Sequence, residues 1–178
     1  MHKQDNNSPI NILMNEHEVI TSAIDIALKA DSLIGKNDEL YLKVATELLS
    51  FFRSYADTIH HKKEDIILFP EMIRKNELLK GGVIKEMYEN HCDFHTMINN
   101  TEQYLIKKDY LRAQQQLHIY AEALLDHIAV ENEEVFQIAE SVFDDIELET
   151  MYFRFIDIDR ETIKPELENI VQQIKEYF

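Results

Sequence analysis

The sequence predicts an all-α protein built on four long helices, with an additional helix or helices at its carboxyl end. Apolar residues recur at three- and four-residue spacing through four long segments, which is typical of amphipathic helices. Only 3 Gly and 3 Pro occur in 178 residues, which leaves little turn chemistry for a many-stranded sheet. The connections between the segments are short, so consecutive helices are expected to be antiparallel neighbours. The length suits a single domain, 1–178.

The first two helices are expected on either side of a turn at Gly35. Ser8 followed by Pro9 is typical of a helix start, and the apolar period then continues to about Leu33. The second periodic run extends to about Phe69, and the following proline disfavours helical conformation just before it.

The third and fourth helices account for the chain up to about Phe143. The third is expected from Gly81-Gly82 to about Lys107, after a shorter segment, and Asp109 suits the cap of the fourth. The remaining stretch, 144–178, is expected to form one or two helices. Its apolar residues could cap the bundle or form a dimer contact, and we expect capping.

Charge and cysteine content exclude several classes of partner. Lys and Arg number 18 against 34 Asp and Glu, so the net charge is -16, and a field of this sign repels nucleic-acid phosphates and anionic lipids. We therefore expect no nucleic acid and no membrane as partners. The single cysteine, Cys92, cannot form an internal disulfide, and the sequence contains no apolar signal or membrane-spanning stretch. A cytoplasmic protein is expected, with Cys92 as a buried, inert thiol.

Histidines and glutamates form a pattern that spans all four predicted helices. Two H-x-x-x-E pairs and one H-x-x-x-H pair occur, and this spacing places both members on one helical face. At 100° per residue these groups lie within the apolar stripes, so they point into the bundle. The candidate metal ligands are His17, His60, Glu64, His91, His95, His127 and Glu131. On the same wheel His61 points outward and His118 lies opposite the apolar face; these two and His2 are expected to have no role in the site.

Buried imidazoles and carboxylates need partners, and metal ions would supply them. Seven ligands exceed the coordination number of one ion, so the inventory predicts two. Two octahedral ions offer about twelve positions; five imidazoles, two bridging carboxylates and a bridging oxo or hydroxo group fill all but about one. The ligand types suit iron best and leave zinc and manganese open. An open position on iron would admit dioxygen or a related small molecule. Neither H-E-x-x-H nor E-x-x-H occurs, which argues against zincins and ferritin-like sites.

Four motifs resemble those of the hemerythrin-like (HHE cation-binding) domains. They are Glu16-His17, HHKKED with LFP at 60–70, HCDFH at 91–95 and HIAVE at 127–131. The resemblance implies an up-down-up-down four-helix bundle over 8–143, with 144–178 as a helical extension. It also implies a di-iron centre bridged by the two glutamates. His91, His95 and His127 would hold one iron, and His17 and His60 the other, which would keep the open position.

The resemblance leaves several functions open. Oxygen-carrying hemerythrins have an Asp five residues after the last histidine, whereas here Glu131 follows His127 by four. One hypothesis is binding, storage or sensing of dioxygen. The alternatives are a di-iron enzyme that handles nitric oxide or peroxide with an electron donor, a role in iron homeostasis or iron–sulfur repair, and an iron-responsive switch. The sequence determines neither the oligomeric state nor whether the protein is an enzyme. Tyr88 and Tyr120 lie near the ligand faces and are expected to pack there.

Overall fold

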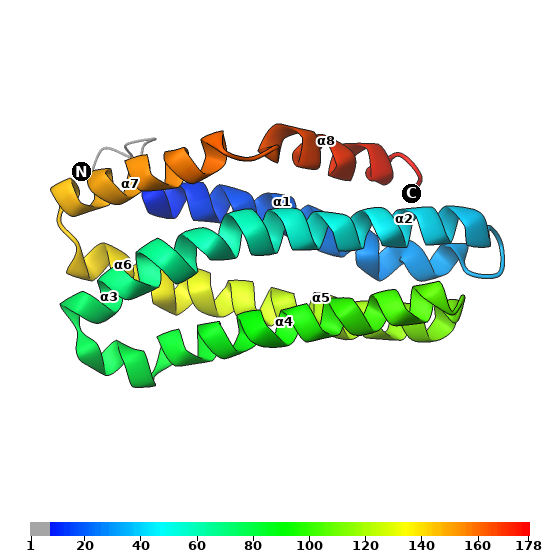
Figure 1. Ribbon diagram of the computed structural model, residues 1–178, viewed down its shortest axis with the longest axis horizontal. Helices are drawn as coiled ribbons and strands as arrows, with labels where there is room; N and C mark the ends of the chain where they lie inside the picture. Colours follow the sequence, from blue (N-terminus) through cyan, green and yellow to red (C-terminus); the bar gives the residue numbers. More distant parts are fainter. Residues whose placement is uncertain (1–7) are drawn as a thin grey trace.

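The computed structural model describes residues 8–178, and His2 lies outside them. Four long helical segments form the bundle, and consecutive segments run antiparallel to each other (Figure 1). The first is α1 (Pro9–Lys29), which begins at the Ser8 cap and ends in a short 3-10 turn, Ala30–Leu33. The third is α4 (Val83–Ile106), which starts just after Gly82. No β-strand occurs within the described residues, so the predicted all-α class is confirmed.

The second and fourth segments are continuous but not uniformly α-helical. The second comprises α2 (Asp38–Phe51), two π-helical stretches at Phe52–His61 and Glu64–Leu68, and α3 (Phe69–Lys75). The fourth comprises α5 (Tyr110–Val130), a π-helical turn at Glu131–Val135, and α6 (Phe136–Val142). A 3-10 turn at Glu77–Gly81 connects α3 to α4. The prediction that the second helix ends before Pro70 was wrong, because this proline lies within the continuous segment, in the first turn of α3.

Two further helices pack lengthwise on the bundle. The capping box of Asp144 and Glu147 starts α7 (Asp145–Arg160), and α8 (Lys164–Lys175) carries Pro165 in its first turn. Both lie along α1, and α8 also contacts α2 and the π-helical stretch that follows it (Figure 1). Their buried apolar residues are Met151, Phe155, Ile158, Leu167, Val171 and Ile174.

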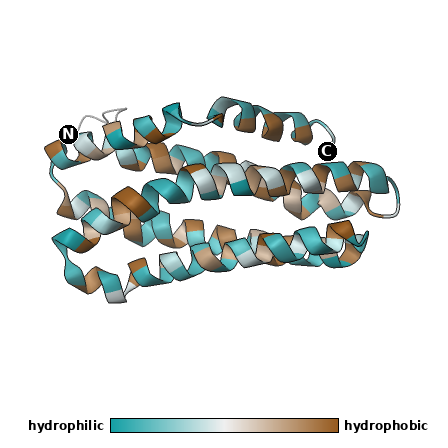
Figure 2. Cartoon of the chain, in the orientation of Figure 1, coloured by the Kyte–Doolittle hydropathy of each residue, from teal (hydrophilic) through white to brown (hydrophobic). Residues whose placement is uncertain are grey.

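The apolar core is divided into two clusters, and the buried histidines and glutamates lie between them. On α1, His17 is flanked by Leu13 in one cluster and Ile20 in the other. On α4, His91 lies in the same way between Met87 and Phe94. The other two segments repeat this order, so apolar residues on each segment bracket one buried polar layer. Figure 2 shows that hydrophobic and hydrophilic residues alternate along every helix, as expected of amphipathic helices.

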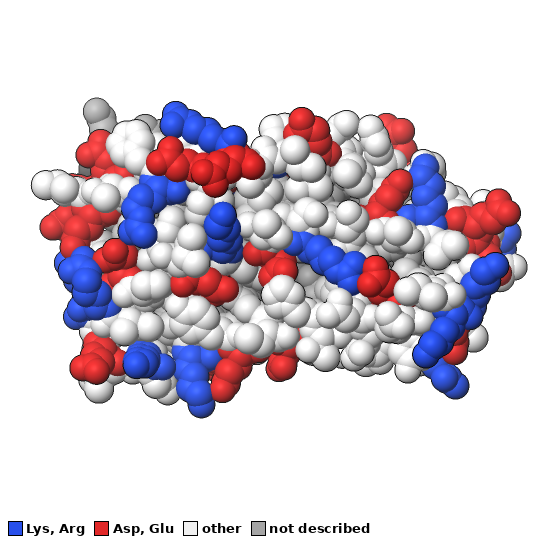
Figure 3. Space-filling view, viewed as in Figure 1, with Lys and Arg blue, Asp and Glu red and all other residues white. Residues whose placement is uncertain are grey.

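The surface carries charges of both signs. On the face shown in Figure 3, acidic and basic side chains are interspersed and form no large patch of one sign. No helix within residues 8–178 has the length and apolar character that crossing a membrane requires.

Candidate metal centre

The buried polar layer contains two groups of side chains with ligand atoms close enough to share an ion. The first group is His17, His60, Glu64 and Glu131; the second is His61, Glu64, His91 and His127. Within each group the ligand atoms lie within 4.8 Å of one another, and all seven residues are buried. Glu64 belongs to both groups, so the two candidate ion positions are neighbours.

The helices contribute these residues through local spacing. His60 and Glu64 are four residues apart, as are His127 and Glu131, so each pair projects from one side of its helix. The Nε2 atom of His60 lies 3.5 Å from Oε1 of Glu64, and that of His127 lies 3.3 Å from Oε1 of Glu131.

The Nε2 atoms of the histidines face each other in pairs. Those of His17 and His60 are 2.9 Å apart, and those of His91 and His127 are 3.1 Å apart. Two ligands at right angles, each about 2.1 Å from an ion, are separated by about 3 Å. The pairs therefore have the spacing of adjacent ligands on a shared ion.

The opposite ring nitrogen, Nδ1, has an oxygen partner in three of these four histidines. It lies 2.9 Å from Asn132 Oδ1 in His17, 3.0 Å from Glu16 Oε2 in His60, and 2.8 Å from Asp65 Oδ1 in His91. A metal-ligating histidine usually donates its other N–H to such a partner, which fixes the tautomer and the ring orientation. These contacts leave the Nε2 lone pairs free to bind an ion.

Each glutamate extends one oxygen toward each histidine group. Oε2 of Glu131 lies 3.2 Å from Nε2 of His17, while its Oε1 is on the His127 side. Oε1 of Glu64 is on the His60 side, and its Oε2 lies 3.7 Å from Nε2 of His91. Both carboxylates thus have the arrangement of bridging ligands.

The polar layer has more acceptors than the protein can satisfy. All four carboxylate oxygens of Glu64 and Glu131 are buried without a hydrogen-bond partner, as are both ring nitrogens of His61. Such groups cost several kilocalories when left unpaired. Imidazole and carboxylate donors that converge in this way fit divalent transition-metal ions, because coordination would satisfy each of them.

The two glutamates also influence each other's protonation. Burial raises the pKa of Glu64 well above its ordinary value, and the negative charge of Glu131 adds to this rise. Burial acts in the same direction on Glu131, but His127 and His17 hold its pKa well below the ordinary value. Burial also lowers the pKa of His60 to about 4, so its imidazole is neutral at pH 7. Neutral imidazole is the form that binds metal ions.

A buried ionic network contacts His60 at Nδ1, the ring nitrogen opposite the one that faces the candidate ion. Glu16 accepts hydrogen bonds from Lys63 and, at 2.6 Å, from Lys164, while its other oxygen contacts His60. Lys63 also pairs with Asp159 at 2.6 Å. Because Asp159 lies on α7 and Lys164 on α8, the carboxyl-terminal helices contribute directly to the surroundings of the candidate centre.

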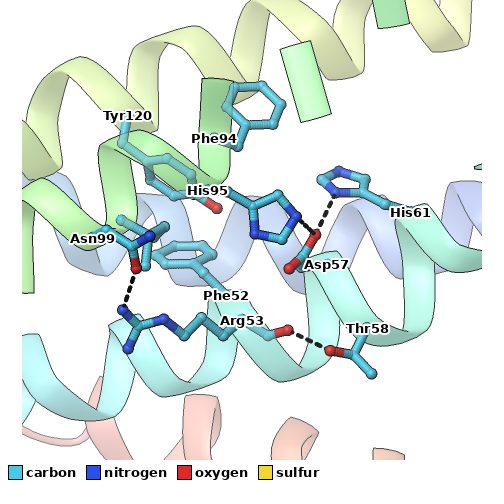
Figure 4. Close-up of a pocket in the computed structure, with 10 residues that line it drawn as sticks. Phe52, Arg53, Asp57, Thr58, His61, Phe94, His95, Asn99 and Tyr120 are labelled. Atoms are coloured by element: carbon cyan, nitrogen blue, oxygen red, sulfur yellow. Dashed lines mark hydrogen bonds and ion pairs between the residues drawn. The ribbon is translucent and has the colours of Figure 1, made fainter. Parts of the chain in front are cut away.

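The structure brings together six of the seven predicted ligands, and His61 takes the remaining place. His95 is 58% exposed, and its Nε2 pairs with Asp57 Oδ1 at 3.0 Å (Figure 4). The prediction that His61 points outward was wrong: its side chain is 3% exposed, and its ring stacks on His91 with centroids 3.8 Å apart. The 100° wheel assumes an α-helix, whereas His61 ends a ten-residue π-helical stretch with wider turns.

The structure also shows the surroundings of three residues outside the candidate ligand set, Cys92, His118 and Tyr88. Cys92 is exposed rather than buried. His118 is half-buried, and its ring nitrogen contacts the Leu28 carbonyl oxygen at 3.2 Å. The Tyr88 hydroxyl donates a hydrogen bond to the carbonyl oxygen of Asp65, whose carboxylate contacts His91.

The fold and the buried layer define a metal-binding helical bundle. The chain belongs to the hemerythrin family, since the model of the hemerythrin HHE cation binding domain matches residues 8–139. The predicted resemblance is therefore confirmed. No curated protein and no solved structure matches the chain significantly.

Proposed function

We propose that this protein holds two iron ions in the polar layer and binds dioxygen, or a related small molecule, at one of them. The observation that carries the proposal is the bridging arrangement of Glu64 and Glu131, each with one oxygen toward each histidine group. Oxygen binding, storage or sensing is the function that this arrangement supports best.

The proposed ligand set follows the two groups. His17 and His60 would hold one ion, His61, His91 and His127 the other, and both glutamates would bridge them. Two adjacent ferrous ions would supply two electrons to a small ligand without a separate donor. The protein orients the imidazoles through their Nδ1 partners and keeps the layer away from bulk water.

Metal content tests the ligand set. Purified protein is loaded anaerobically with ferrous iron, freed of excess and analysed for iron. We expect two irons per chain in the wild type and in His95→Ala, and about one in His61→Ala. Far-UV circular dichroism controls for folding. Two irons in His61→Ala and one in His95→Ala would contradict the assignment of His61.

Visible absorption tests the function. The iron-loaded protein is measured before oxygen, after oxygen, and again after oxygen is stripped away. A charge-transfer band that appears with oxygen and disappears on stripping is the expected result. A band that persists as an oxidised di-iron species would contradict reversible binding. It would favour the alternative, a di-iron enzyme that turns over peroxide or nitric oxide with a reductant.

A further inference from the structure

A pocket lies at the surface beside the second histidine group. It is formed between the π-helical stretch Phe52–His61 and α4, is bounded on the α5 side by Tyr120, and has a volume of about 250 Å³. Figure 4 shows the rings of His95 and His61 on either side of the Asp57 carboxylate. All three side chains line the pocket, and all three are of types that bind metal ions.

The potential ligand atoms of these residues form a continuous series from the surface to the candidate centre. Nε2 of the exposed His95 lies 3.0 Å from Oδ1 of Asp57, and this oxygen lies 3.7 Å from Nδ1 of His61. A ring nitrogen of His61 lies within 4.8 Å of ligand atoms of the other members of the second group. The 3.0 Å separation in the outer pair is that of adjacent ligands on a shared ion. An ion that moves along this series would remain close to protein ligands at every step.

His61 connects the outer pair to the second group. Its side chain is 3% exposed, and neither ring nitrogen has a hydrogen-bond partner within residues 8–178. Buried polar groups are usually hydrogen-bonded, so a buried imidazole without partners indicates a missing ligand. The ring stacks on His91 and Phe94, but no hydrogen bond fixes its rotamer. Rotation of this ring would carry a nitrogen atom from the Asp57 side towards the second group.

The charges around the pocket favour a cation. The Asp57 carboxylate contacts two imidazoles, whose nitrogen atoms can bind an ion together with it. Arg53 also lines the pocket, but its guanidinium is paired with Glu102 at 2.8 Å. One carboxylate with imidazole neighbours is a donor set that suits a divalent transition-metal ion.

The side of the first group is less suited to the entry of a cation. Glu16, which contacts His60, is paired with the ammonium groups of Lys63 and Lys164. The same two lysines pair with Asp159. Both carboxylates are therefore neutralised by protein cations, which an incoming metal ion would have to displace. The packing and the charges thus favour entry from the pocket beside His61.

We propose that Asp57 and His95 form an outer site that captures a divalent metal ion, and that His61 transfers the ion from this site to the second group. This inference rests on the proposed di-iron function, in which the ion is ferrous iron. Glu64 belongs to both groups and connects the second ion position to the first. Asp57 and His95 are then loading residues, which determine the rate of iron uptake but not the final number of ions.

The kinetics of iron uptake test the outer site. Metal-free protein is mixed anaerobically with two equivalents of ferrous iron, and the iron still accessible to a colorimetric chelator is measured at timed intervals. Asp57→Asn and His95→Ala should each lower the initial rate of uptake at least about fivefold, and both should still bind two irons at the end. The double variant should be no slower than the slower single variant, because both residues belong to one site.

Asp157→Asn and His118→Ala are the matched controls. Asp157 is exposed, pairs with Arg160 and does not line this pocket, so its replacement removes the same charge elsewhere. His118 lies outside the pocket and contacts the carbonyl oxygen of Leu28. Both controls should take up iron at the wild-type rate. Asp57→Glu keeps the carboxylate and should retain most of that rate, which separates ion binding from a purely structural role.

Three results would overturn parts of this account. Wild-type uptake rates in Asp57→Asn and His95→Ala, with two irons bound, would overturn the inference alone. One iron fewer at the end of loading in either variant would also overturn it, because that residue would then be a permanent ligand. A wild-type protein that binds no iron would overturn the proposed function and this inference together.

Discussion

Lys63 shows how one residue connects the candidate centre to the rest of the molecule. It is fully buried and pairs with Glu16, which holds His60, and with Asp159 on α7. An ammonium group in this position is stable only because two carboxylates surround it. Removal of its charge would leave Glu16 and Asp159 with Lys164 as their shared cation.

Lys63→Met should therefore lower the free energy of unfolding by about 3 kcal/mol, the cost of breaking a buried ion pair. Urea unfolding of the metal-free protein measures it. Lys85→Met is the matched control, because Lys85 is exposed and, among residues 8–178, pairs only with Glu89 on the same helix turn. An equal decrease in the free energy of unfolding in the two variants would contradict a structural role for the buried network.

The residue scale also shows which residues of the candidate metal centre could be predicted from the sequence. His17, His60, His91 and His127 were predicted to point inward from the helical period, and all are buried. His61 was missed because no single-sequence period reveals a π-helical turn. His95 follows His91 by four residues, the same spacing as in the two H-x-x-x-E pairs. Its ring nonetheless pairs with Asp57, and the ring of His61 stacks on His91 instead.

At the scale of elements, the π-helical stretches have the largest effect on the candidate site. They occur in the second and fourth segments, where the H-x-x-x-E pairs lie. Wider turns let the consecutive residues His60 and His61 both face the polar layer, which an α-helix with 100° between neighbours does not favour. Such turns often occur at functional sites.

The helix α8 belongs to the stretch that the sequence predicted to cap the bundle. Its three buried residues join the same core cluster as α1 and α2, so it stabilises the bundle directly. Ile174→Ala should lower the free energy of unfolding by about 2–4 kcal/mol, because Ile174 is fully buried. Ile163→Ala, at a side chain that is 60% exposed, should have little effect. Chemical denaturation measures the free energy of unfolding of both variants. Similar values would contradict the inference that packing of α8 on the core stabilises the bundle.

At the scale of the whole molecule, the polar layer divides the apolar core, and we expect metal binding there to stabilise the fold. Glu64 and Glu131 place unpartnered carboxylate oxygens between two apolar clusters. Ion binding to the folded state alone stabilises it by about 2.7 kcal/mol at a free metal concentration one hundred times the Kd.

We therefore expect ferrous iron to raise the unfolding temperature under anaerobic conditions, and a chelator to lower it to that of the metal-free protein. Calorimetry measures both. A double variant, Glu64→Gln with Glu131→Gln, provides the control: it lacks both carboxylates of the candidate centre, so iron should have little effect on its unfolding temperature. A metal-free wild type as stable as the loaded protein would contradict this expectation.

The sequence by itself determined the all-α class, the four long helices and the family, because these depend on local periodicity, caps and motif spacing. It also predicted that Glu64, Glu131 and four of the histidines lie together in the candidate metal centre. The tertiary structure decided what depends on helix phase and on contacts between distant segments. These are the inward turn of His61, the outward turn of His95, the Glu16–Lys63–Asp159 network and the pocket beside Tyr120. Their positions follow from π-helical turns and from packing across segments up to about 150 residues apart, as in the contact of Lys164 with Glu16, and local periodicity carries no information about either.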